Sequence, residues 1–244
     1  MSTFVNPIAL PNLYVNGCNL TYVSATAMTV GVGQIRSSEN NTDIEVDSAL
    51  TLNTAISGAG GLDTGTIAAS SCYYVYILVD LTKNTPLKAI CSLSSTGPLV
   101  PADYTESFVR VGAFYTNSSS QILKAQYEMN SKQRVVEYDA VITELTAGNA
   151  TSFTAVDLTS SVPATSRLAL INVVYTPATA GNSFFLRPTG STSTNGKPFT
   201  SNVASQPITF PIMMNTNSAQ SIDYKVTASG DALTIYVLGY IDNI

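Results

Sequence analysis

The chain has 244 residues, of which 45% are apolar and only 11% are charged, and its formal net charge is −5. Its 11 basic residues form no cluster, so the charge pattern speaks against nucleic acid and membrane surfaces as partners. The chain contains no histidine, which excludes Ser-His-Asp and Cys-His triads and the usual catalytic zinc ligand sets.

The length predicts two domains, because it exceeds the usual size of one β-sandwich domain. A polar break at Met129–Arg134 separates two apolar halves, and we place the boundary there, with domains at residues 1–132 and 133–244. No apolar run approaches the roughly 20 residues of a membrane helix. The first ten residues also lack a basic segment, so we expect neither a transmembrane span nor a signal peptide.

Alternating side chains predict strands in the first half, where no window carries a helical stripe of ten residues. Met28–Val32 alternates cleanly, and Asp43–Asp47 places two apolar side chains on one face and three carboxylates on the other, facing water. Tyr73–Val79 is apolar on both faces, as in a central strand, and Phe108–Tyr115 is its expected partner. Ser120–Met129 fits either one short helix or a strand.

The second half repeats this pattern and completes the fold prediction. Further strands are expected at Arg167–Tyr175, Ser183–Leu186, Ile222–Val226 and Leu233–Tyr240. The stretch Gly190–Asn202 is rich in Ser, Thr, Asn and Gly, and we expect a mobile loop there. The predicted class is all-β, with two antiparallel β-sandwich, jelly-roll-like domains.

The cysteines are three in number, Cys18, Cys72 and Cys91, and none lies in a Cys-x-x-Cys spacing. The spacing therefore indicates neither a disulfide framework nor a zinc site. We expect three small, buried, apolar residues.

The segment Gly58–Gly65 superficially resembles a phosphate-binding loop. It lacks the Gly-Lys-Ser/Thr ending, and no helix-forming segment follows it. We interpret it as a glycine-rich turn between strands, in which Asp63 accepts hydrogen bonds from its own backbone.

The acidic residues Glu39, Asp43, Glu45 and Asp47 have three possible roles. They could act as paired carboxylates in glycoside hydrolysis, or as calcium ligands. Neither the burial that raises one carboxylate pKa nor the close spacing of a calcium loop is indicated. A solvated strand face is the favoured interpretation.

The tyrosines of the first half have two alternative roles. They could line a surface that contacts a glycan or a protein, since tyrosine suits sites with one apolar and one wet end. Packing in the core is favoured, because the strand that holds three of them is so apolar. The set is Tyr73, Tyr74, Tyr76, Tyr104 and Tyr115.

The first half also carries a recognisable series of motifs. A Gly-Leu-Asp-Thr-Gly turn at Gly61–Gly65 leads into the Tyr-rich run Cys72–Asp80, and a Ser-rich segment follows at Cys91–Ser95. A Pro-x-x-Pro-x-x-Tyr stretch ends at Tyr104, and an Arg-x-Gly strand occupies Arg110–Gly112. This series resembles a group of tailed-bacteriophage virion proteins, over about residues 15 to 130.

The resemblance implies a structural component of a virion that is made in the host cytoplasm. Such a protein decorates the capsid or sits at the tail tip or baseplate, and it assembles as a homotrimer or larger oligomer with other particle subunits. No catalytic, cofactor-binding or metal-ligating residue is expected. One alternative is a receptor- or glycan-binding tail protein that reads a host surface through loops such as Gly190–Asn202. A carboxylate-only polysaccharide depolymerase ranks last.

Overall fold

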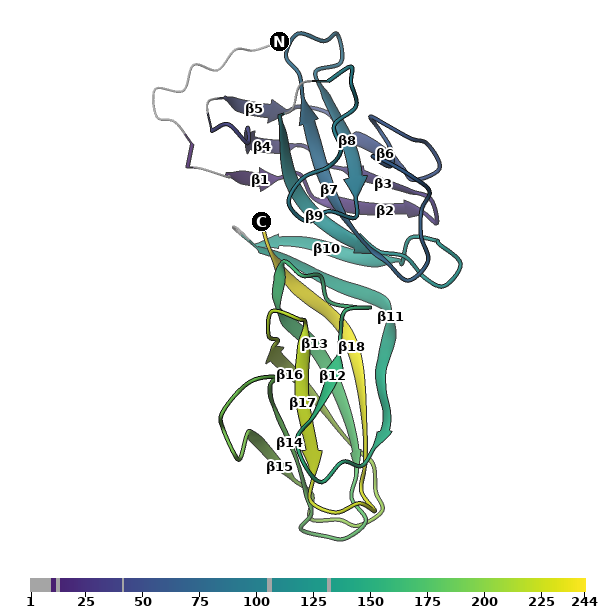
Figure 1. The fold of residues 1–244 in the computed structure, drawn as a ribbon, viewed down its shortest axis with the longest axis vertical. Helices are drawn as coiled ribbons and strands as arrows, with labels where there is room; N and C mark the ends of the chain where they lie inside the picture. The colour runs from purple at the N-terminus through teal and green to yellow at the C-terminus, as the bar shows by residue number, and fades with distance from the viewer. Residues whose placement is uncertain (1–9, 12–13, 41, 105–106, 131–132) are drawn as a thin grey trace. The chain divides into compact units, whose positions relative to one another are not determined.

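The computed structural model describes residues 10–11, 14–40, 42–104, 107–130 and 133–244. Within these residues every regular element is a strand, and the named strands for which a register is known pair antiparallel (Figure 1). The predicted all-β class with antiparallel sheets is confirmed. The described part contains no helix of the length and apolar character needed to cross a membrane.

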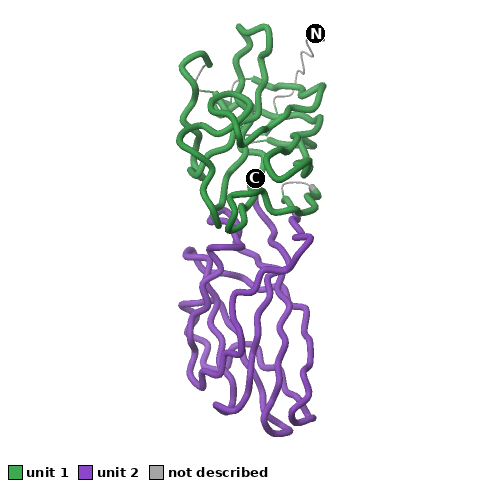
Figure 2. Tube along the Cα trace, turned by 90° about the vertical axis from the view of Figure 1, so that its right-hand side faces the viewer, with its two compact units in different colours: residues 1–134, 244 green, residues 135–243 purple. Residues whose placement is uncertain are grey.

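The chain divides into two compact units (Figure 2). Unit 1 comprises residues 1–134 with residue 244, and unit 2 comprises residues 135–243. The division falls between Arg134 and Val135, whereas residues 131 and 132 of the predicted polar break lie outside the described residues.

Unit 1 contains three small sheets, with the strand orders β1-β4-β5, β2-β3-β6 and β8-β7-β9, and β10 lies beside β2. In Figure 1 the strands β7, β8 and β9 run across the strands β2, β3 and β6. The bounds are β1 Val15–Gly17, β2 Leu20–Ser24, β3 Ala27–Val30, β4 Gly33–Arg36, β5 Asp43–Val46, β6 Leu50–Asn53, β7 Cys72–Val79, β8 Leu87–Ser92, β9 Phe108–Tyr115 and β10 Ala125–Asn130.

Strand β7 is the centre of unit 1, as its apolar pattern predicts. It is buried from Tyr73 to Val79 and lies between β8 and β9, which confirms β9 as its partner. Tyr74 and Tyr76 join one apolar cluster, while Tyr73 points to the other face and stacks on Phe114 with ring centroids 5.6 Å apart. Both faces of this strand are therefore core, so a polar residue has no exposed position on it.

The segment Ser120–Met129 forms a turn followed by a strand, so the helix alternative is wrong. Ser120 has a positive φ of 58°, and the side chain of Asn117 accepts hydrogen bonds from the backbone of Ser119 and Gln121. Such side-chain bonds favour a turn over a helix. The strand alternative is confirmed from Ala125 onward.

Unit 2 is built from two sheets that pack face to face. In one sheet the strands follow the order β11-β18-β13-β16, and in the other the order β12-β17-β14-β15. The ring of Tyr175 lies 5.1 Å from that of Phe184, and Phe210 lies 5.3 Å from the same ring, so side chains from both sheets share one core. The bounds are β11 Gln133–Gly148, β12 Thr154–Asp157, β13 Ser166–Thr176, β14 Ser183–Pro188, β15 Lys197–Thr200, β16 Ile208–Asn215, β17 Ser221–Val226 and β18 Ala232–Asn243.

All four strands predicted for the second half are present, as β13, β14, β17 and β18. The prediction of a loop throughout Gly190–Asn202 is wrong in part, because β15 lies within this stretch and pairs with β14. Phe199 explains the strand, since its ring stacks on the buried Phe184 at 4.7 Å. In the sheet that contains β13, the last strand is β16, and its Pro211 lies opposite Asn172 of β13.

Candidate functional site

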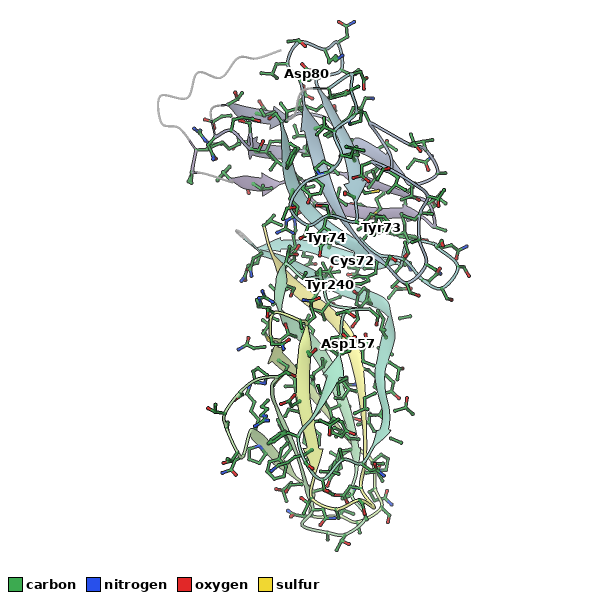
Figure 3. All side chains as sticks on the ribbon, in the orientation of Figure 1. Cys72, Tyr73, Tyr74, Asp80, Asp157 and Tyr240 are labelled. Carbon is green, nitrogen blue, oxygen red and sulfur yellow. The ribbon has the colours of Figure 1, made fainter. Side chains whose placement is uncertain are left out.

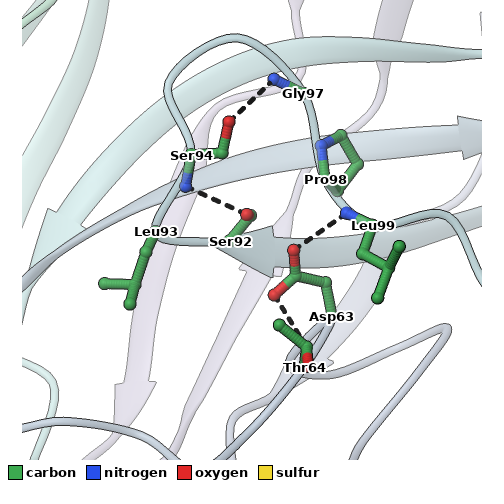
Figure 4. Close-up of a pocket in the computed structure, with 8 residues that line it drawn as sticks. All are labelled: Asp63, Thr64, Ser92, Leu93, Ser94, Gly97, Pro98 and Leu99. Carbon is green, nitrogen blue, oxygen red and sulfur yellow. Dashed lines mark hydrogen bonds between the residues drawn. The ribbon is translucent and has the colours of Figure 1, made fainter.

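A depression of about 400 Å³ lies in unit 1, between the turn Gly61–Gly65 and the loop that follows β8 (Figure 4). It falls within the part of the chain that carries the resemblance to virion proteins. The residues that line it are Asp63, Thr64, Ser92, Leu93, Ser94, Gly97, Pro98 and Leu99.

The turn that forms one wall is attached to the edge of β8. The backbone N–H of Cys91 donates to the carbonyl oxygen of Gly61 at 2.9 Å, and the N–H of Asp63 donates to the carbonyl oxygen of Cys91 at 2.9 Å. Leu62 lies between them and is buried. A Cβ atom at Gly61 would lie 2.2 Å from the carbonyl oxygen of Ile56, so only glycine fits this position.

Gly61→Ala is therefore expected to lower the free energy of unfolding of unit 1 by about 1–3 kcal/mol, because the backbone of Ile56 must move. Urea denaturation followed by circular dichroism measures this change. Gly31→Ala is the matched control, since its Cβ would meet the nearest backbone oxygen at an acceptable 3.4 Å. Equal effects of the two substitutions would contradict the steric explanation.

The carboxylate of Asp63 connects the two walls of the depression (Figure 4). Its Oδ1 accepts a hydrogen bond from the N–H of Thr64 at 2.7 Å, as the turn interpretation predicts. Its Oδ2 accepts from the N–H of Leu99 at 2.9 Å, across 36 residues of sequence. Asp63 therefore fixes the shape of the depression.

The second wall rests on aromatic residues of the core. The Tyr76 hydroxyl donates to the carbonyl oxygen of Ser94 at 2.7 Å, and the Ser92 Oγ accepts from the N–H of Ser94 at 3.0 Å. Gly97 lies directly over Phe108, whose Cζ would be 2.6 Å from an added Cβ. Core side chains thus determine the position of this loop.

The depression combines exposed apolar side chains with polar groups. Leu93 is 59% exposed and Leu99 is 63% exposed, and both stand beside the Asp63 carboxylate and several hydroxyl groups. Exposed apolar side chains around a recess are typical of surfaces that contact another molecule.

The acidic residues of the first half are dispersed among separate partners. Asp43, Glu45 and Asp47 are all exposed, so the solvated-face prediction holds for these three, and Asp43 also accepts a hydrogen bond from the guanidinium of Arg36 at 2.7 Å. Within the described part of the chain no three His, Cys, Asp or Glu side chains come together as a metal-ligand group.

Glu39 is held at the surface by hydroxyl groups. Ser107 donates to one carboxylate oxygen at 2.7 Å and Ser38 to the other at 3.1 Å. Burial opposes ionisation here, but these hydrogen bonds outweigh it and hold the pKa of Glu39 below its usual value.

The tyrosine series belongs to the core, as the favoured interpretation predicts. Tyr73, Tyr74, Tyr76 and Tyr115 are each less than 5% exposed, so they line no external platform. Tyr104 is half-buried, and its hydroxyl donates to the carbonyl oxygen of Thr85 at 3.0 Å.

The three cysteines are thiols that form no disulfide. Cys18 and Cys91 are fully buried, as predicted, and burial raises the pKa of Cys18 to about 11 and that of Cys91 to about 12. Cys72 departs from the prediction because it is only half-buried, at the start of β7 (Figure 3).

The loop between β14 and β15 is tied to the sheet beneath it. Arg187 donates to the carbonyl oxygen of Ser193 at 2.7 Å, and the Lys225 ammonium donates to that of Thr194 at 3.3 Å. The same two cations lie 3.8 Å and 4.7 Å from the ring centre of Phe153. The loop backbone is thus held by the cation–aromatic group of Phe153, Arg187 and Lys225.

Arg134 is a structural residue that the sequence does not reveal. It is only 1% exposed, and its Nε donates to the carbonyl oxygen of Val111 at 2.9 Å, where β9 carries a bulge. One terminal nitrogen donates to the carbonyl oxygens of Gly17 at 2.8 Å and Cys18 at 2.9 Å, and the other donates to the side chain of Asn19. In the sequence Arg134 appears only as part of a polar break.

Asp231 plays a similar part in unit 2. Its carboxylate is 2% exposed and accepts hydrogen bonds from Tyr175 Oη at 2.9 Å, from Asn182 Nδ2 at 2.8 Å and from the N–H of Ala178 at 2.8 Å. A further bond comes from the N–H of Ala228 at 3.2 Å. Burial alone would raise the pKa of Asp231, but these bonds outweigh burial and lower it.

Comparisons with known proteins identify no family for this chain. No protein-family model matches the chain, and no curated protein matches its sequence. Partly similar solved structures include the infectious bursal disease virus Gx strain, with a TM-score of 0.19 and 13% identity over 96% of this chain and 69% of that one. The VP2 subviral particle of the same virus gives a TM-score of 0.17 and 13% identity, over 96% and 75%.

A third neighbour is a tryptic core variant of Bacillus thuringiensis Cry1Da, with a TM-score of 0.15 and 9% identity over 97% of this chain and 52% of that one. Similarity this weak carries no argument about function. No family model or curated protein tests the resemblance to tailed-bacteriophage virion proteins, so the phage assignment stays a prediction.

Proposed function

We propose that this chain is a non-enzymatic structural component of a tailed-bacteriophage virion, a capsid-decorating or tail-tip protein that assembles with other particle subunits. The observation that supports this best is the role of the residues behind the resemblance. Gly61 permits close backbone contact with Ile56, Asp63 joins two loops, and the tyrosines of β7 fill the core. These residues stabilise the fold, as expected of a structural protein that assembles with other subunits through its surface.

Quantitative mass spectrometry of particles purified from the infected host tests the virion role. We expect the chain at a copy number stoichiometric with capsid or tail proteins. Its absence from purified particles, with the chain present in the lysate, would reject the proposal.

The non-enzymatic part has a separate test. Purified chain incubated with host capsular polysaccharide is expected to release no more reducing sugar than a boiled sample. Release above that control would instead favour a carboxylate-only depolymerase.

Recognition of a host receptor or glycan is the second candidate function, and the loop between β14 and β15 is the observation that favours it. Its backbone is fixed by Arg187 and Lys225, while the side chains of Thr192 and Asn195 are exposed. A fixed backbone with exposed polar side chains suits recognition, because little entropy is lost on binding.

Deleting residues 190–202 would remove β15 along with the loop, so a point variant is the sharper test. The double substitution Thr192→Ala/Asn195→Ala is expected to reduce particle adsorption at least tenfold without affecting particle yield. Thr146→Ala, an exposed threonine on β11, is the matched control. Unchanged adsorption by the double variant would show that this loop does not recognise the host surface.

A further inference from the structure

Three neighbouring strands of the sheet that contains β13 form an uncharged surface, whereas β11 of the same sheet carries Glu137, Asp139 and Glu144. No residue is charged from Leu168 to Thr176 on β13, along β16, or from Ala232 to Ile241 on β18. One side of these strands forms the core of unit 2, where Ala169 and Val173 are fully buried. The other side carries the alternate residues.

The strand register identifies those residues. Leu170 lies opposite Met213 of β16, and Asn172 lies opposite Pro211 of β16 and Tyr236 of β18. Residues directly opposite each other in antiparallel strands share a face. The outer face is therefore formed by Leu168, Leu170, Asn172, Val174, Pro211, Met213 and Tyr236, together with the uncharged polar residues Thr209, Asn215 and Thr234.

This outer face is more apolar than solvent contact favours. An antiparallel sheet with one side in water normally alternates apolar and polar residues, whereas β13 alternates apolar with mostly apolar. Met213 is 55% exposed, and Leu168, Leu170 and Val174 are half-buried. Such a pattern is typical of a sheet covered on both sides.

We propose that the outer face binds the same face of a second copy of this chain. Charge favours this occupant. The chain carries a net charge of −5, so two copies repel each other over most surfaces, but here they meet without bringing carboxylates together. A two-fold contact places the same apolar side chains on both sides, which makes the surface complementary to itself.

Asn172 supplies the second argument. Its Oδ1 is buried and has no hydrogen-bond partner among the described residues, at the centre of the outer face. A buried amide oxygen without a donor is unfavourable, and rotation about χ2 can turn it outward at little cost. An amide both donates and accepts, so the Asn172 side chains of two copies satisfy each other across a two-fold axis.

The area is of the right order. The three strands of this face, β13, β16 and β18, have 11, 8 and 12 residues. At the usual strand spacing and rise they present roughly 500 Å² of projected sheet. Each partner in a standard interface buries about 800 Å² of accessible surface. Because side chains make the face uneven, its accessible surface is larger than its projected area.

The test is the mass of the purified full chain in solution, by light scattering and sedimentation. We expect at least twice the 25.7 kDa of a single chain. Met213→Glu, which places a carboxylate on the outer face at an exposed position, is expected to weaken association at least tenfold. Val203→Glu is the matched control, because Val203 is 52% exposed outside this face, and it should leave the mass unchanged.

A monomeric wild-type chain over the whole soluble concentration range would overturn the inference. An oligomer unaffected by Met213→Glu and by Thr209→Glu, at a second exposed position of the same face, would also overturn it. Circular dichroism verifies that each variant folds. If Met213→Glu does not fold, Thr209→Glu decides the result. The virion proposal is tested separately by particle composition, so either can fail alone.

Discussion

Arg134→Met is expected to destabilise unit 1 by about 3 kcal/mol or more, among the largest effects of any single substitution in this chain. The guanidinium satisfies carbonyl oxygens of Gly17, Cys18 and Val111, which remain in place when it is removed. Each buried acceptor left without a donor costs about 1–3 kcal/mol. The gain from burying an apolar methionine is too small to offset this loss.

The comparison variants separate geometry from charge. Arg134→Lys keeps the charge but not the planar fork of donors, so it should recover only part of the loss. Lys83→Met removes an exposed charge in the same unit and should change stability by no more than about 0.5 kcal/mol. Urea denaturation gives the energies, and hydrogen exchange at residues 15–20 and 108–115 locates the effect. A loss for Arg134→Met no larger than that for Lys83→Met would refute this role.

Asp231→Ala is expected to lower the stability of unit 2 by about 3 kcal/mol, since it leaves the buried hydroxyl of Tyr175 and the part-buried donors of Asn182 and Ala178 without an acceptor. Glu137→Ala, an exposed carboxylate of the same unit, is the control. Denaturation of both variants is compared with the wild type. Similar losses in the two variants would show that the network contributes little.

The same carboxylate gives unit 2 a defined pH dependence. The folded-state pKa of Asp231 lies below its ordinary value of 3.8, so the unfolded state binds the proton more tightly. Its stabilising contribution is therefore fully present above about pH 4 and is lost as the pH falls through the lowered folded value. Asp231→Asn should make stability less dependent on pH below 4, and an unchanged slope would contradict this assignment.

The sequence pattern was sufficient where burial follows local alternation. β7 and β13 were predictable because each strand carries its own apolar signal over eight or more residues. β15 was not, because its four residues include a lysine, a proline and a threonine, and only the stacking of Phe199 on Phe184 explains it. Short strands of this kind depend on tertiary contacts, which local patterns do not contain.

The candidate site was predictable to the same limited extent. The bond from Asp63 to its neighbour follows from turn chemistry, but its bond to Leu99 depends on two distant loops meeting. Arg134 contacts residues more than 100 positions earlier, and a single arginine in a polar segment carries no sign of that. Long-range polar partners of this kind come from the fold itself.

Pro211 lies on the last strand of its sheet, where it acts against the addition of strands from other chains. β16 is an eight-residue strand at the end of its sheet, and an open edge of that length can recruit strands from other chains into fibres. A proline has no N–H to donate, so a foreign strand finds an interrupted hydrogen-bond ladder at its midpoint. This interruption disfavours amyloid-like addition of strands at the edge of β16.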